Sequence, residues 1–164
     1  MLKYLMFIVL FSVLSCKSLN TIQETPECPK GYECNTEILK NQSIKLLEDS
    51  IGEIYINTKS DDNYHIIKYT YKYKDQANIA DDSYVETFYF QVPKDAKNLS
   101  LSNKDLSNAK VFTQKSCFCR DAGYELIQQG QLDIQKQKGG YHLKFEYESK
   151  RDMKVKAIET QVEL

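Results

Sequence analysis

The sequence predicts an all-β protein, a single antiparallel β-sandwich or barrel-like domain of about eight strands. Three observations predict this class. Apolar and polar residues alternate with a period of two in several segments, which is typical of strands with one buried face and one wet face. No segment shows a long helical period. Turn-forming residues separate the alternating segments, at 61–63, 81–83, 93–95, 103–105 and 139–140.

The strands follow from the alternation in chain order. The third and fourth show it best: Tyr69, Tyr71 and Tyr73 alternate with lysine and threonine, and Phe88 and Phe90 alternate with threonine, tyrosine and glutamine. Residues 105–109 could form one helical turn. Many short strands at regular spacing favour a sandwich or barrel. The expected strands are 36–47, 52–58, 64–74, 84–92, 110–118, 124–128, 131–137 and 141–148, with a further one near 154–163.

One hairpin has a testable register. The Gly-Gly pair at 139–140 suits a two-residue turn that needs positive φ. With this pair as the loop, Ile134 faces Phe145, and the apolar residues of both strands share one side. On the other side Asp133 meets Glu146, a mildly unfavourable pair. A slip of one residue would break the agreement of the apolar faces.

The first residues have the layout of a secretory signal. Lys3 gives a basic start, residues 5–14 are apolar, and the small Ser15 precedes Cys16. The apolar run is too short to cross a membrane, which takes about 20 residues. A buried first strand or helix is the alternative, and the absence of any comparable apolar run later in the chain counts against it.

The end of this segment, Val-Leu-Ser-Cys at 13–16, resembles the bacterial lipobox, although Val13 stands where leucine is commonest. The resemblance implies that the signal 1–15 is removed and that Cys16 is acylated and anchors the chain in a lipid membrane. Residues 16–27 are then the lipidated cysteine and a polar tether, and 28–164 the β domain.

Because Lys17 and Ser18 lack the aspartate that retains some lipoproteins at the inner membrane, we expect an outer-membrane location. The whole chain resembles the small uncharacterised lipoproteins of Bacteroidota, a resemblance that implies no activity.

The charge balance excludes a nucleic-acid partner. The 164 residues carry 22 basic and 23 acidic side chains, a formal charge of −1. Removal of 1–15 takes away Lys3 and no acidic residue, so the mature charge becomes −2. A basic footprint for nucleic acid or a polybasic membrane patch is therefore absent from the composition. The remaining 149 residues are enough for one domain with a core.

Four cysteines remain after Cys16. An even number in an exported domain favours disulfides, and four cysteines allow three pairings. Residues two apart in an extended strand lie about 6.5 Å apart at Cα, near the upper limit for a bridge. We therefore expect cross-links that staple the start of the domain to a central strand rather than local bridges. The four residues are Cys28, Cys34, Cys117 and Cys119.

The alternative for Cys117 and Cys119 is a soft-metal or thiol-active site. With two further thiolates, Cys-x-Cys could hold Cu(I) or Zn²⁺. The five-residue spacing of the other pair is unlike a zinc knuckle, which has two to four intervening residues. Redox catalysis would favour C-x-x-C at a helix N-terminus, which the sequence lacks.

Each of the other candidate sites also has a purely structural interpretation. Tyr69, Tyr71 and Tyr73 could form a binding face for sugars or bases, although core packing is the favoured interpretation. Ser50, in Asp-Ser-Ile, resembles the short sequence that Bacteroidota glycosylate on exported proteins. His65 and His142 belong to no catalytic motif, and we expect both to be exposed. The acidic pairs at 61–62 and 81–82 lack a calcium-loop pattern and are expected in turns.

The function expected from these observations is a membrane-anchored, non-enzymatic envelope lipoprotein that acts by binding or structural contact. No catalytic residue, cofactor or metal is expected in this interpretation. Its partners are the lipid membrane, through Cys16, and either another envelope protein or a glycan. The alternative function is thiol or metal handling, with copper or zinc, by Cys117 and Cys119.

Overall fold

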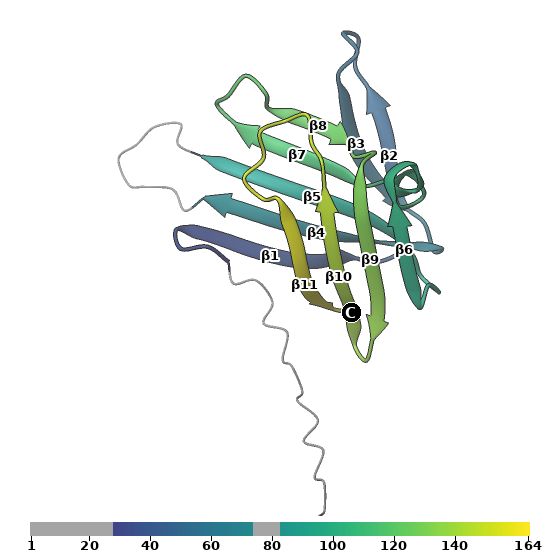
Figure 1. Cartoon of the computed structure of the whole chain (residues 1–164). Helices are drawn as coiled ribbons and strands as arrows, with labels where there is room; N and C mark the ends of the chain where they lie inside the picture. Colours follow the sequence, from purple (N-terminus) through teal and green to yellow (C-terminus); the bar gives the residue numbers. More distant parts are fainter. Residues whose placement is uncertain (1–27, 74–82) are drawn as a thin grey trace, which may run out of the picture.

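The computed structural model describes residues 28–73 and 83–164, and this part of the chain is all-β (Figure 1). All strand pairings are antiparallel. One 3₁₀ helix, η1, covers Asn103–Ala109. The strands are β1 (Tyr32–Leu39), β2 (Gln42–Glu48), β3 (Ile54–Ser60), β4 (Tyr64–Tyr73), β5 (Tyr84–Pro93), β6 (Asn98–Ser102), β7 (Phe112–Cys117), β8 (Gly123–Leu126), β9 (Gly130–Gln137), β10 (Gly140–Tyr147) and β11 (Ala157–Glu163).

Two sheets pack face to face and confirm the sandwich-like class. The first has the order β1-β4-β5-β7-β8, and the second has the order β11-β10-β9-β6. Inward residues at alternate positions of both sheets form the main core, because a strand turns every second side chain to the same face. Ile67, Phe88 and Phe90 supply the first sheet's part, and Leu143 and Phe145 supply the second sheet's part.

The β2–β3 hairpin covers part of the other face of the first sheet and makes a local third layer. Ile44 of β2 packs with Ile66 and Phe112 in a second, smaller core. Its backbone N–H also donates to Gln91 Oε1 at 2.7 Å. Ile66 and Ile67 point to opposite faces of β4, and both are fully buried. Strand β4 is therefore covered on both of its faces. The far end of the hairpin extends beyond the sheet (Figure 1).

The strand count was underestimated. The expected strand 36–47 is two strands, β1 and β2, joined by a turn in which Asn41 has φ of 53°. Strand β6 was missed because its sequence, NLSLS, is short and rich in turn-forming residues. The helical turn expected at 105–109 is confirmed within η1, so the turn at 103–105 is the start of that helix. The expected turn at 81–82 lies outside the described residues.

The register expected for the β9–β10 hairpin was wrong by two residues. Gly140 pairs with Gln137, so the loop is Lys138-Gly139, and Gly139 has the positive φ of 91°. Gly140 belongs to the strand and pairs with both β9 and β11, and a Cβ there would lie 1.9 Å from a backbone oxygen of β11. The two-residue shift keeps the apolar faces together and sets Asp133 opposite Lys144, which replaces the unfavourable acidic pair.

Candidate functional site

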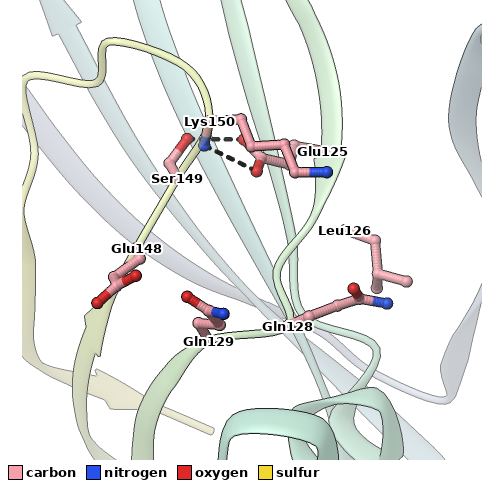
Figure 2. Close-up of a pocket in the computed structure, with 7 residues that line it drawn as sticks. All are labelled: Glu125, Leu126, Gln128, Gln129, Glu148, Ser149 and Lys150. Carbon is pink, nitrogen blue, oxygen red and sulfur yellow. Dashed lines mark hydrogen bonds between the residues drawn. The ribbon is translucent and has the colours of Figure 1, made fainter.

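The connection between β10 and β11, residues 148–156, is fastened to the end of the first sheet. The carboxylate of Glu125 on β8 accepts hydrogen bonds from Ser149 Oγ at 2.6 Å and from the backbone N–H of Lys150 at 3.0 Å (Figure 2). The Arg151 guanidinium donates to three backbone carbonyls of 121–124, at 2.5, 2.8 and 2.9 Å. The connection therefore has a fixed backbone although it contains no regular secondary structure.

A fully buried carboxylate holds the other half of this connection. Glu86 on β5 accepts the backbone N–H of Lys154 at 2.5 Å and that of Val155 at 2.9 Å, and it also accepts the Tyr84 hydroxyl. A carboxylate without such donors would be too costly to bury. The alternation already placed Glu86 on the same face as Phe88, so a buried carboxylate was detectable from the sequence.

A buried lysine lies opposite Glu86 on the next strand. Lys115 Nζ donates to Asp121 Oδ2 and to the carbonyl oxygen of Asp152, both at 2.7 Å. The hydrogen bond from Lys115 holds the pKa of Asp121 below its usual value, and the backbone N–H of Asp152 adds to this effect. These contacts fix the loop after β7 and the β10–β11 connection in one arrangement.

Beside this fastened connection lies a polar groove. It consists of three adjoining hollows of about 200, 460 and 420 Å³, which share lining residues. The first hollow is drawn in Figure 2 and lies between the β8–β9 segment and the β10–β11 connection. The groove is lined by Ile54, Ser102, Asn103, Asp121, Tyr124, Glu125, Leu126, Gln128, Gln129, Gly130, Gln131, Glu146, Tyr147, Glu148, Ser149, Lys150 and Arg151.

The centre of the groove offers side chains without protein partners. Within residues 28–73 and 83–164, the exposed amides of Gln128 and Gln129 and the carboxylate of Glu148 make no side-chain hydrogen bond. Each amide can both donate and accept, and each carboxylate accepts. Because Glu146 adds a further negative charge, the groove suits an uncharged, hydroxyl-rich ligand better than an anion. No motif in the sequence marks these residues.

The cysteines pair locally, which makes the expected staple between distant segments wrong. Cys28 and Cys34 form one disulfide, with Cα atoms 5.7 Å apart, and Cys117 and Cys119 form another, with Cα atoms 5.3 Å apart. The argument against a Cys117–Cys119 bond assumed an extended strand. Strand β7 ends at Cys117, and Cys119 lies in the following bend, which shortens the Cα separation.

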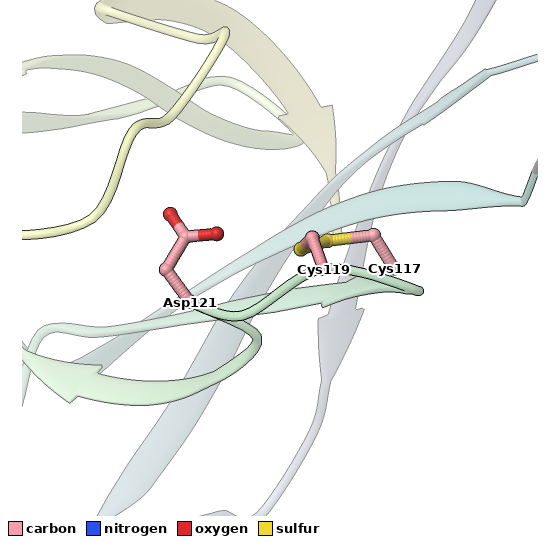
Figure 3. Close-up of side chains that lie close together, drawn as sticks. All are labelled: Cys117, Cys119 and Asp121. Atoms are coloured by element: carbon pink, nitrogen blue, oxygen red, sulfur yellow. A yellow bond between two sulfur atoms is a disulfide. The ribbon is translucent and has the colours of Figure 1, made fainter.

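The second disulfide lies beside a carboxylate. The sulfur atoms of Cys117 and Cys119 and a carboxylate oxygen of Asp121 all lie within 4.8 Å of one another (Figure 3). Cys119 is exposed, whereas Cys117 and Asp121 are half-buried. Phe118, between the cysteines, is 90% exposed. The third member, Asp121, was not among the residues that the sequence singled out.

The tyrosine stripe faces the interior of the sandwich. Tyr71 is buried and stacks on Tyr32, with ring centroids 4.4 Å apart, which is the position of a packing residue. Tyr69 is half-buried and meets Phe88 edge to face at 6.0 Å. Tyr69 and Tyr71 also line a cavity of about 180 Å³ beside residues 154–159. Tyr73 is half-buried at the end of β4.

The histidines lie on different sheets, and neither is exposed. His65 is buried, contrary to expectation, and its Nδ1 accepts the backbone N–H of Asn41 at 3.1 Å. Burial lowers the pKa of His65, which fits a neutral ring that accepts this bond. His142 is half-buried, with Nε2 at 3.2 Å from Glu159 Oε1.

Ser50 is exposed in the β2–β3 turn. Asp49 Oδ1 fixes this turn by accepting the N–H groups of Ile51 and Glu53, each at 2.9 Å. The side chain of Ile51 is 82% exposed. A modifying enzyme could therefore reach Ser50, whose glycosylation stays a prediction. The acidic pair at 61–62 lies in the expected turn, where Asp61 Oδ1 accepts from Asn63.

Cys16, the signal 1–15 and the tether up to residue 27 lie outside the described residues. In the part of the chain that the structure covers, no helix has the length and apolar character that a membrane crossing requires.

The chain has no match among protein-family models, curated proteins or solved structures.

Proposed function

We propose that this protein is a lipid-anchored protein of the cell envelope that binds a glycan in the polar groove without catalysing a reaction. The anchor is Cys16, on the resemblance of residues 13–16 to a lipobox. The outer membrane is the proposed location, since Lys17 and Ser18 lack the inner-membrane retention signal. The polar tether carries the domain away from the lipid surface.

The groove is the observation that supports binding. Its central side chains, Gln128, Gln129 and Glu148, make no side-chain hydrogen bond within the described chain. The hydrogen bonds of Glu125 and Arg151 fix the backbone around them. A ligand therefore meets polar groups on a prearranged frame, which limits the ordering cost of binding. Amides beside carboxylates match the paired donors and acceptors of sugar hydroxyls.

The charge of the groove favours a neutral glycan over an anionic ligand. Glu125, Glu146 and Glu148 line it together with Lys150, so acidic groups outnumber basic ones at its centre. Tyr124 lines the adjoining hollow and offers a ring on which a sugar could stack. Binding of another envelope protein at this surface is the other outcome that the experiment can return.

Capture from native membranes tests this proposal. The full chain with its anchor is recovered from envelope extracts, and bound carbohydrate is measured. The double variant Gln128→Ala/Gln129→Ala should capture about tenfold less carbohydrate than the unaltered chain, because each lost hydrogen bond is worth about 0.5–1.5 kcal/mol. Gln135→Ala/Gln137→Ala is the matched control, since both glutamines are exposed on β9 outside the groove.

The control should capture as much carbohydrate as the unaltered chain. Equal capture by the groove variant, or capture of protein without carbohydrate, would contradict glycan binding in the groove.

A further inference from the structure

We propose that the Cys117–Cys119 disulfide is the closed form of a Cu(I) site, in which both thiolates and the Asp121 carboxylate are the ligands. Asp121 also lines one hollow of the groove, whereas the two cysteines line none of its three hollows, and this inference does not rest on the proposed function. It starts from three ligand atoms of the described chain that lie within 4.8 Å of one another (Figure 3).

The carboxylate is already held in place for this role. Asp121 Oδ2 accepts Lys115 Nζ at 2.7 Å and the backbone N–H of Asp152 at 3.0 Å. Both contacts use Oδ2, which leaves Oδ1 for a metal ion. Such outer contacts orient a ligand and are part of a working metal site. The two sulfurs come from one short loop, so opening the disulfide leaves them close to the carboxylate.

The ligand set favours Cu(I) over Zn²⁺. Thiolates are soft ligands, which Cu(I) prefers, and Cu(I) is stable with two or three ligands. A structural zinc site almost always has four protein ligands. Among the described residues, the group of histidine, cysteine and carboxylate ligands at this place has three members.

An external dithiol opens the site. It gives two electrons and two protons to the Cys117–Cys119 bond and leaves as a disulfide, so that two thiols form. Cu(I) then replaces the two thiol protons, which pass to solvent, and its oxidation state does not change. Cys119 is the more exposed of the two cysteines, so the dithiol attacks its sulfur first. The other disulfide is half-buried, and Cys34 packs against the main core, so it should be reduced later.

Anaerobic competition for Cu(I) tests the inference. The full chain is reduced with dithiothreitol, freed of the reductant, and titrated against the coloured Cu(I) complex of bicinchoninate. The reduced chain should take one Cu(I) that the oxidised chain does not take. Cys28→Ser/Cys34→Ser is the matched control, because it removes the other disulfide and should keep this binding. Cys117→Ser/Cys119→Ser should abolish it.

Asp121→Asn examines the third ligand. This variant keeps the size of the side chain and an acceptor for Lys115, and it should weaken Cu(I) binding by about tenfold or more. Copper-edge X-ray absorption of the unaltered chain gives a second measurement, which does not depend on a variant. It should find two sulfur ligands and one oxygen.

Several results would overturn the inference. They are the absence of Cu(I) uptake by the reduced chain, uptake that survives Cys117→Ser/Cys119→Ser, and equal uptake by the oxidised chain. A copper spectrum without the oxygen ligand would remove Asp121 from the site and refute the three-ligand arrangement.

Discussion

Replacement of Tyr71 by alanine separates a packing role of the tyrosine stripe from a binding role. Tyr71 is 6% exposed and lies in the main core. Truncation of a large buried aromatic side chain costs about 3–5 kcal/mol. The cavity next to Tyr71 lets water reach part of the space, which favours the lower end, whereas the lost stacking on Tyr32 adds about 1 kcal/mol. We therefore expect a loss of about 4 kcal/mol.

Urea unfolding followed by far-UV circular dichroism measures this loss of free energy. In thermal unfolding, a loss of about 4 kcal/mol lowers the Tm of a domain of this size by roughly 10–15 °C. Tyr55→Ala is the matched control, because Tyr55 lies on β3 and is 41% exposed. The control should stay within about 0.5 kcal/mol of the unaltered chain. A similarly small change for Tyr71→Ala would refute the packing argument and return the stripe to a binding role.

Three further predictions concern the anchor, alkaline pH and one close backbone contact. Cys16→Ala should abolish acylation and release the protein from membranes, and partition of this variant into detergent would contradict the anchor. Burial raises the pKa of Tyr71 and of Tyr89 to about 12, so their neutral forms are favoured in the folded state. The free energy of unfolding should hold up to pH 10 and fall between pH 10 and 12, as urea midpoints at pH 8 and 11 can show. Gly140→Ala should cost about 3 kcal/mol or more, because its Cβ would lie 1.9 Å from a backbone oxygen of β11. Gly139→Ala, which meets no atom within 4 Å, should cost only about 1 kcal/mol for its positive φ, and equal losses would contradict the close contact.

The period-two pattern predicted the fold class because both sheets bury one face against the other. It was least informative where burial departs from that rule. In β4, Ile66 and Ile67 are buried on opposite faces because the β2–β3 hairpin adds a third layer. The pattern also cannot distinguish hairpin registers that differ by two residues, since both keep the same faces together. The pairing of Gly140 with β11 is long-range and so is not contained in the local alternation.

The candidate site was less predictable from the sequence than the fold. The groove residues Gln128, Gln129 and Glu148 come from two connections about 20 positions apart, and only the packing of the two sheets brings them together. Asp121 was likewise not singled out, because its position beside the disulfide depends on the bend after β7. Glu86 did have a signal, since a carboxylate in phase with buried phenylalanines needs internal donors.

Both disulfides close short loops, with sequence separations of 6 and 2. In the chain-entropy model such loops add only about 1–2 kcal/mol each, because they restrict little of the unfolded chain. Cohesion between the sheets is thus non-covalent, and folding does not need to wait for oxidation. The sandwich can therefore form with its cysteines reduced, and the thiols can be oxidised or reduced afterwards without loss of the fold.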